Sequence, residues 1–436
     1  MSEKPPIKVL IILTWPGKDR SYRSRLSSWL SYAPTTLGSL CAIVKGVRPK
    51  WQVDTLDEMS DKIIFDAGSY DIVMISATTP AVKRGYEIAD EFRKRGSYIC
   101  MGGYHVSYNH EEALAHADTV IAGPGEYALK SFIEDFEAGH PERFYSIPDV
   151  RGEDIPAPDR SAIKLKHYYK WPAVTANNGC MNHCTYCLIS EMWRCSSPRP
   201  VENVINEIKA LRKRIIIFYD PNFFGNRSYS IELMKELKKL KIRWAGSATI
   251  SIGFDEELLK LAKESGCAGL LFGLESMNKK ALDATGKLFN DPKDYRQAIV
   301  NIQRHGIMVN GCFILGMDGD SEEELMSLPD QVDYLGLNLA RFAVLTPVPG
   351  SELYKELETK GRIIDRDWDH YTQHCVVFKP SGMSPERLEE IYRYVWKETY
   401  RMKNIIRRIR RVENAGIISR ITCFTANMGF KYLGIS

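Results

Sequence analysis

The sequence has no long apolar run. Its longest uninterrupted runs, such as residues 9–13 and 215–219, have about five residues, whereas a helix needs about 20 to cross a bilayer. The first six residues also lack the charged start and the apolar stretch of a secretory signal. We therefore expect no membrane span and a cytoplasmic location.

Cysteine is also scarce. Ten cysteines in 436 residues are too few for a disulfide scaffold, and a reducing cytoplasm disfavours structural disulfides. Clustered cysteines are therefore expected to bind metal or take part in catalysis. The isolated ones are expected to be small buried apolar side chains; they are Cys41, Cys100, Cys267, Cys312, Cys375 and Cys423.

A strong excess of one charge is absent from most of the chain. The net charge is +4, and residues 401–436 alone hold eight Lys or Arg and one Glu. This basic tail has no interleaved aromatic residues on which nucleic-acid bases could stack. We therefore expect no nucleic-acid partner.

What the sequence does contain is an alternation of short apolar runs with amphipathic stretches. Over residues 1–140 this alternation predicts a Rossmann-like, doubly wound parallel sheet with helices on both faces. Prolines among charged residues predict a linker over 141–169. About six further β/α units over 170–350 predict a partial (β/α)6 TIM barrel. We expect residues 351–436 to form a helical C-terminal region with a basic tail.

Cys180, Cys184 and Cys187 lie within eight residues, in a loop after a predicted strand. Thiolates this close select zinc or an iron–sulfur cluster. A structural zinc ion needs a fourth ligand, and His183 is poorly placed for that role because it is adjacent to Cys184. Three thiolates instead favour a 4Fe-4S cluster in which one iron remains free to bind a substrate.

The C-x3-C-x2-C spacing, with an aromatic residue before the last cysteine, resembles the signature of the radical S-adenosylmethionine (SAM) superfamily. The resemblance implies that the open iron holds SAM, which is cleaved to a 5'-deoxyadenosyl radical that abstracts hydrogen from an unactivated carbon. It extends over about residues 175–350 and implies SAM-binding residues, whereas it identifies no catalytic residue. Those residues are Tyr186, Asp220, Asn222, Glu275, Ser276, Gly311 and Ile314. Asp220 departs from the more common Gly-Gly-Glu pattern.

The first domain resembles the cobalamin-binding domain of the class B radical methylases and their relatives. Glycines, small hydroxyls and other polar residues follow its predicted strands, at the edge where doubly wound sheets bind ligands. The cobalamin-binding residues implied are Trp15, Ser76, Thr78, Thr79, Gly102, Gly103, His105, Gly123, Gly125 and Glu126. The Asp-x-His-x-x-Gly sequence that supplies an axial imidazole elsewhere is absent, so His105 is not implied as an axial ligand. A cofactor-free domain is the alternative.

Together the resemblances imply a cobalamin-dependent C-methyltransferase acting on a large apolar substrate, such as a lipid, hopanoid or tetrapyrrole. An external flavodoxin or ferredoxin would supply electrons. A cobalamin-associated cyclase or rearrangement enzyme without methyl transfer is the alternative. An RNA-modifying radical SAM enzyme is a minor alternative. Such enzymes hold a second cluster through three N-terminal cysteines, whereas only Cys41 and Cys100 precede Cys180 here.

The run of Arg407, Arg408, Arg410 and Arg411 has two interpretations. It is either a solvated face or a peripheral contact with anionic lipid headgroups, since isoleucines and phenylalanines flank it.

Overall fold

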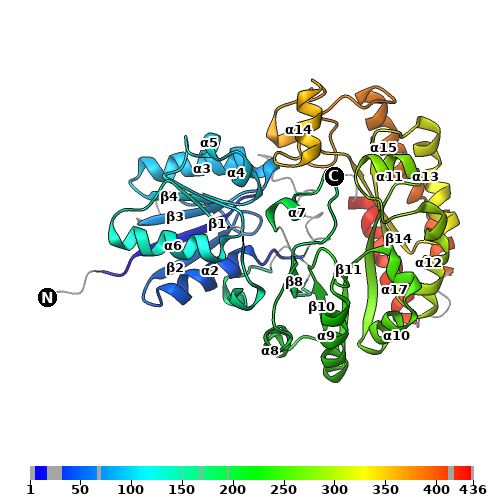
Figure 1. Ribbon diagram of the computed structural model, residues 1–436, viewed down its shortest axis with the longest axis horizontal. Helices are drawn as coiled ribbons and strands as arrows, with labels where there is room; N and C mark the ends of the chain where they lie inside the picture. The colour runs from blue at the N-terminus through cyan, green and yellow to red at the C-terminus, as the bar shows by residue number, and fades with distance from the viewer. Residues whose placement is uncertain are drawn as a thin grey trace.

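The computed structural model describes residues 5–16, 32–65, 70–147, 149–165, 168, 170–193, 196–410 and 417–433. Over these residues the chain forms two six-stranded parallel sheets and one small two-stranded antiparallel sheet, with helices packed against both large sheets (Figure 1). The predicted mixed α/β class with parallel sheets is confirmed.

The first sheet has the strand order β2-β1-β3-β4-β5-β6, and every neighbouring pair is parallel. Its strands are β1 (Lys8–Leu13), β2 (Gln52–Asp57), β3 (Ile72–Ser76), β4 (Tyr98–Gly102), β5 (Thr119–Ala122) and β6 (Phe144–Ser146). The chain order reverses beside β1, and sheets of this kind bind ligands at the carboxyl ends of the strands next to such a reversal. Because β6 lies within the predicted linker, the first sheet extends further along the chain than expected.

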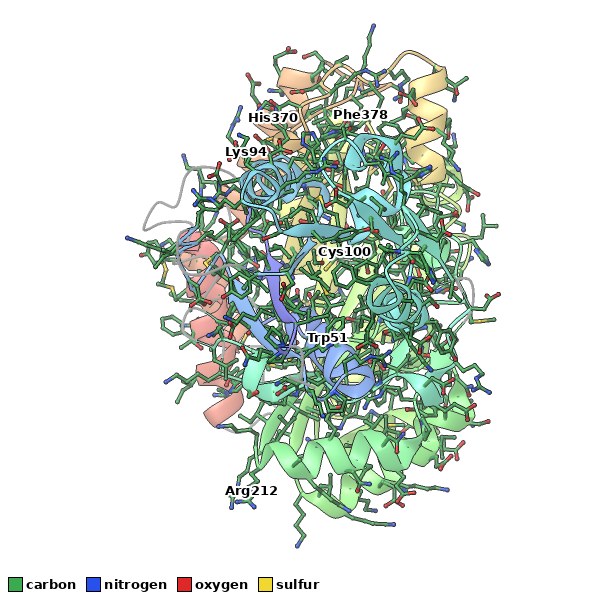
Figure 2. The ribbon with its side chains drawn as sticks, turned by 90° about the vertical axis from the view of Figure 1, so that its left-hand side faces the viewer. Trp51, Lys94, Cys100, Arg212, His370 and Phe378 are labelled. Atoms are coloured by element: carbon green, nitrogen blue, oxygen red, sulfur yellow. The ribbon has the colours of Figure 1, made fainter. Side chains whose placement is uncertain are left out.

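Helices cover both faces of the first sheet. Val9 and Ile11 of β1 join a core with α2 (Thr36–Val47) and α6 (Gly125–Ala138), whereas Leu10 and Ile12 join a second core with α3 (Val82–Lys94). The sequence of β1 is a continuous apolar run because both of its faces are buried. The isolated Cys100 is buried at the centre of this sheet, with Trp51 nearer its lower edge (Figure 2).

The second sheet has the order β14-β13-β12-β11-β10-β7, again all parallel. Its strands are β7 (Ala173–Val174), β10 (Ile215–Phe218), β11 (Arg243–Ala248), β12 (Cys267–Glu275), β13 (Met308–Leu315) and β14 (Leu339–Val344). The helices are α8 (Val201–Leu211), α9 (Arg227–Leu240), α10 (Glu256–Glu264), α11 (Lys279–Ala284), α12 (Pro292–Arg304) and α13 (Glu322–Leu335). Six strands agree with the six predicted β/α units.

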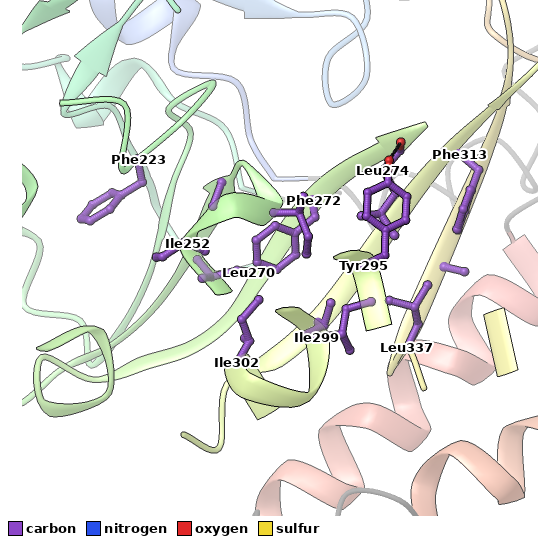
Figure 3. Close-up of a cluster of buried hydrophobic side chains, with 14 of the residues drawn as sticks. Phe223, Ile252, Leu270, Phe272, Leu274, Tyr295, Ile299, Ile302, Phe313 and Leu337 are labelled. Atoms are coloured by element: carbon purple, nitrogen blue, oxygen red, sulfur yellow. Dashed lines mark hydrogen bonds between the residues drawn. The ribbon is translucent and has the colours of Figure 1, made fainter. Parts of the chain in front are cut away.

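One face of the second sheet packs on these helices. Figure 3 shows Phe272 of β12 and Tyr295 and Ile299 of α12 among the buried side chains between the strands and this helix. The Tyr295 hydroxyl donates a hydrogen bond to Leu274 O at 2.7 Å, so this buried phenol is satisfied. Along β13, fully buried residues alternate with half-buried ones, because successive side chains point to opposite faces. We call the face opposite the helices the inner face.

The C-terminal region consists of α14 (Glu352–Thr359), η5 (Trp368–His370), α15 (Pro385–Thr399), α16 (Met402–Arg410) and α17 (Ile417–Leu433). The Asn427 side chain of α17 donates to Asn338 O at 3.1 Å, just before β14, and α17 lies beside that strand (Figure 1). Since β14 is the last strand of its sheet, α17 shields an otherwise exposed edge.

The basic run in this region is only partly solvated. Arg408 is fully buried; its guanidinium donates to Thr399 O and Asn427 Oδ1 and lies 5.2 Å from the centre of the Tyr400 ring. Arg407 pairs with the buried Asp333 at 2.9 Å. The expectation that Arg408 faces lipid headgroups is therefore wrong, and Arg411 lies outside the described residues. Within the part of the chain that is described, no helix is long and apolar enough to cross a membrane.

The first domain contacts the C-terminal region directly. Lys83 of α3 pairs with Asp367 at 2.9 Å, and Figure 2 shows His370 of η5 close to Lys94 at the end of α3. Four of the six isolated cysteines are buried as expected, whereas Cys312 and Cys375 are half-buried.

Candidate functional site

The three clustered cysteines lie in the connection between β8 (Asn177–Asn178) and α7 (Leu188–Met192). Cys184 is buried, and Cys180 and Cys187 are half-buried. The Cys187 N–H donates to Cys184 O at 2.9 Å, so these two residues share a tight turn at the start of α7.

Long-range backbone contacts hold this loop in place. Thr185 N–H donates to Thr285 O at 3.1 Å, and Leu353 N–H donates to Thr185 O at 2.9 Å. Gly286 has a φ of +71°, and a Cβ there would lie 2.7 Å from His183 O. A glycine is required at 286 because the cysteine loop passes so close.

The donor set fits an iron–sulfur cluster better than zinc. A structural zinc ion needs a fourth ligand beside three thiolates. In a 4Fe-4S cluster each thiolate binds a different iron, so three cysteines in one loop suit that cofactor.

A buried ion pair lies beside the cysteine loop. Lys287 Nζ is 2.8 Å from Glu275 Oε1 and 3.4 Å from the Tyr186 hydroxyl. Burial acts to lower the pKa of Lys287, but the charges of Glu275 and Cys184 outweigh it and raise that pKa. Burial also raises the pKa of Tyr186. The structure therefore holds a protonated lysine against the predicted cluster.

Glu275 ends β12 at a register shift and has a φ of +67°, a backbone conformation that is strained for a residue with a side chain. Tyr186 and Glu275 were predicted as SAM-binding residues, and the structure brings them together through Lys287. Lys287 was missed, because a single lysine in a loop has no pattern that distinguishes it from a solvated one.

The structure gives Asp220 a different role from SAM binding. It is buried, and its carboxylate accepts hydrogen bonds from the N–H groups of Ala176 at 2.8 Å and Asn177 at 3.1 Å. Burial raises its pKa to about 7. Asp220 therefore fixes the backbone that leads into the cysteine loop and has both oxygens occupied.

The remaining residues predicted to bind SAM lie in different environments. Ser276 Oγ accepts from Asn278 N–H at 3.0 Å and so caps a turn. Asn222 is buried with no hydrogen-bond partner for Oδ1 among the described residues. A Cβ at Gly311 would meet Leu337 at 2.7 Å, on the helix side of β13. Ile314 lies at a half-buried position of the inner face.

Two residues predicted to bind cobalamin have close packing contacts within the protein. Gly103 has a φ of +108°, and a Cβ there would lie 2.5 Å from Ala77 O. His105 is fully buried, with its ring centre 5.0 Å from that of Trp368 and its Nε2 3.4 Å from Glu112 Oε1. The cobalamin contacts of Gly103 and His105 stay predictions.

The turn after β5 is open. A Cβ at Gly123 would meet no atom within 4 Å, and one at Gly125 would meet only Leu40, at 3.9 Å. Glu126 begins α6 with a carboxyl oxygen that is buried and has no partner among the described residues, and burial raises the pKa of this carboxyl. The 123–126 turn is therefore unobstructed at both glycines and has an unused polar group beside it.

The other predicted residues at this sheet edge vary in exposure. Thr78 is exposed, Thr79 is buried, and Trp15, Ser76 and Gly102 are half-buried. The Trp15 N–H donates to Glu58 Oε2 at 3.3 Å. The contacts of these residues with cobalamin stay predictions.

The carboxyl edge of the first sheet lies next to the cysteine loop. Tyr104, at the start of α4 (Tyr104–Tyr108), is half-buried, and burial together with the charges of Cys187 and Tyr219 raises its pKa to about 12. A Cβ at Gly350 would lie 2.2 Å from Cγ of Tyr108, so α4 also touches the turn after β14. Figure 1 shows α4 on the side of the first sheet that faces α7 and α14.

Comparison with known proteins agrees with this geometry. The model of the Radical SAM superfamily matches residues 174–331. The chain is 28% identical over 375 residues to bacteriochlorophyllide d C-12(1)-methyltransferase of Chlorobaculum tepidum, over 83% of this chain and 81% of that relative. It is 26% identical over 354 residues to anaerobic magnesium-protoporphyrin IX monomethyl ester cyclase of Rubrivivax gelatinosus, over 72% and 62% of the two chains.

A solved structure shares the fold across both domains. It is the radical S-adenosylmethionine methyltransferase TsrM of Kitasatospora setae, with cobalamin and a 4Fe-4S cluster bound. The TM-score is 0.67 at 17% sequence identity, over 89% of this chain and 85% of that one.

Proposed function

We propose that this chain, which carries a radical SAM domain, is a cobalamin-dependent C-methyltransferase that acts on an unactivated carbon of a large apolar substrate such as a tetrapyrrole, hopanoid or other lipid. The first sheet would be the Rossmann-like cobalamin domain and the second a partial barrel. The observation that carries the proposal is the packing of α4 on the turn after β14: a Cβ at Gly350 would lie 2.2 Å from Tyr108, and Leu353, three residues later, donates to Thr185 of the cysteine loop.

The residues present fit the three cofactors. Cys180, Cys184 and Cys187 would hold the cluster, and the open turn at Gly123 and Gly125 would receive cobalamin. When bound, the cluster and SAM would supply a 5'-deoxyadenosyl radical, and cobalamin the methyl group.

The chain's own residues would bind and orient SAM. Lys287 is a buried cation beside the cysteine loop, so it would pair with the carboxylate of SAM. Glu275 would keep Lys287 charged and in position. Its second carboxylate oxygen would accept a hydrogen bond from a hydroxyl group of the ribose. The phenol of Tyr186 would limit the movement of the lysine.

The substrate would lie on the inner face of the second sheet. Leu271, Ile314 and Ala343 occupy half-buried positions there, and they offer an apolar surface next to the cluster loop. Their partial exposure contrasts with the full burial of the side chains that face the helices. A substrate with a large apolar body would complete the burial of these residues.

Product analysis tests the reaction. Anaerobically prepared protein is incubated with SAM, a reduced flavodoxin and a bacteriochlorophyllide, and 5'-deoxyadenosine and S-adenosylhomocysteine are both quantified. Methyl transfer requires both products. Formation of 5'-deoxyadenosine without S-adenosylhomocysteine would favour the alternative, a cyclase without methyl transfer. The similarity to the Rubrivivax cyclase supports this alternative.

We further propose that α16 contacts a membrane surface. Lys403, Ile406, Arg407 and Arg410 are spaced so that they share the exposed face of this helix, whereas Ile405 and Arg408 face inward. On α17, Ile421 and Phe424 are also exposed, at 57% and 39%. An apolar and basic surface of this kind suits anionic lipid and would bring the enzyme to a membrane-resident substrate.

A further inference from the structure

Arg341 lies on the inner face of the second sheet. It occupies β14 opposite Cys312 of β13. Its neighbours along the strand face the helices: the Phe342 ring lies 5.4 Å from that of Trp396, and Ala340 O accepts a hydrogen bond from the Tyr400 hydroxyl. Because side chains alternate along a strand, Arg341 and Cys312 share the opposite face.

The guanidinium of Arg341 has no acidic partner. It is exposed and forms no ion pair with any carboxylate in the described part of the chain. The centre of the Phe430 ring lies 5.8 Å from it. In contrast, Arg199, Arg362, Arg387 and Arg407 all pair with carboxylates.

Two uncharged groups lie near Arg341. His374 and Tyr392 share a 2.6 Å hydrogen bond nearby, and burial together with the charge of Arg341 lowers the pKa of His374, which keeps that imidazole neutral. An arginine fork with neutral neighbours is a ready binding group for a carboxylate, which it can hold through two parallel hydrogen bonds.

A second polar group on the same face also has no partner. Asn310 precedes Cys312 by two residues on β13, so its side chain shares the inner face, and its Oδ1 is buried with no hydrogen-bond partner among the described residues. A buried amide oxygen without a donor costs free energy unless a ligand or water satisfies it. Around Asn310 and Arg341 the inner face presents Leu271, Gly273, Ile314 and Ala343.

We propose that Arg341 binds a carboxylate of the substrate, and that the substrate is therefore an amphiphile with an apolar body and an acidic group. The proposal rests on the proposed function, because it takes the inner face of the second sheet as the substrate site. The apolar positions contact the body of the substrate. Arg341, at the edge strand, anchors its acidic end and fixes which carbon lies nearest the cluster loop.

Binding of matched acids and esters tests this assignment. The probes are pheophorbide a and its methyl ester, and hexadecanoic acid and its methyl ester, measured by equilibrium dialysis against the cluster-loaded protein in mild detergent. The wild type should bind the acid of at least one pair about 10-fold more tightly than the ester, the ratio expected for loss of one charge-assisted hydrogen-bonded contact.

Three variants make the test specific. Arg341→Met should abolish the preference for the acid by weakening acid binding alone, and Arg341→Lys should keep part of it. Arg393→Met, a change at an exposed arginine of α15, should leave all affinities unchanged. Iron content and the unfolding midpoint check that each variant is folded.

Equal affinity of the wild type for acid and ester in both pairs, including no binding of either, overturns the assignment. An acid preference that persists in Arg341→Met overturns it as well. The proposed function is judged separately: a protein that prefers the acid through Arg341 but never forms S-adenosylhomocysteine retains this site and loses methyl transfer.

Discussion

Replacing Lys287 with methionine removes the cation of the buried pair while keeping most of the side-chain volume. The side chains of Lys287 and Glu275 are only 9% and 10% exposed, so Glu275 would be left with an uncompensated charge. Breaking a buried pair from one side costs about 3–5 kcal/mol. We expect the lower end, about 3 kcal/mol, because the carboxyl of Glu275 can take up a proton.

The free energy of unfolding, from urea titrations followed by circular dichroism, measures this loss. Lys280→Met is the matched control, since Lys280 is an exposed lysine of α11, and it should change stability little. The double variant Lys287→Met with Glu275→Gln should recover part of the loss, because neither charge is then left alone.

SAM affinity gives the functional half of the same experiment. A charge-assisted hydrogen bond to the SAM carboxylate contributes about 1.5–3 kcal/mol, so Lys287→Met should weaken SAM binding about 10- to 150-fold. The double variant should recover stability without recovering SAM affinity. The reasoning is refuted if Lys287→Met and Lys280→Met behave alike, or if the double variant is less stable than Lys287→Met alone.

Three further predictions use matched variants. Cys184→Ala should lower iron content and abolish 5'-deoxyadenosine formation, whereas Cys375→Ala should do neither; normal turnover in Cys184→Ala would reject the cluster assignment. Gly125→Trp should block cobalamin binding, seen in the visible spectrum, without loss of iron, whereas Gly46→Trp, at another unobstructed position, should bind cobalamin normally. Arg408→Met should destabilise the protein by about 3–5 kcal/mol because it strips a buried ion-pair and hydrogen-bond network. Lys403→Glu with Arg410→Glu should leave stability nearly unchanged but release the protein from anionic vesicles, and vesicle binding that ignores both salt and these changes would contradict the membrane surface.

The two proposed cofactor sites lie at the edges of different sheets, which has a mechanistic consequence. The turn that would receive cobalamin and the loop that would hold the cluster belong to different sheets, and α4 carries Tyr104 from one to the other. Contacts such as Lys83 with Asp367 fix the first domain against the C-terminal region. The distance between the two cofactors would therefore be set by domain packing.

The shared loop of Cys180, Cys184 and Cys187 and the two parallel sheets could be predicted from the sequence because both signals are local. Three thiolates within eight residues can meet one cluster whatever the rest of the chain does, and the alternation of apolar runs and amphipathic stretches reflects burial that each strand and helix experiences individually. For the same reason the isolated cysteines Cys41, Cys100, Cys267 and Cys423 were correctly expected to be buried.

The roles of single polar residues were decided by tertiary structure. Asp220 binds backbone groups 43 and 44 residues before it, Glu112 beside His105 accepts a hydrogen bond from Trp368 256 residues later, and Lys287 meets Glu275 across a loop. Residue type and local spacing are the same whether such a side chain faces a ligand, a backbone amide or another domain. Only the folded chain determines which partner lies within reach, because a hydrogen bond or ion pair depends on a separation of about 3 Å that no local pattern encodes.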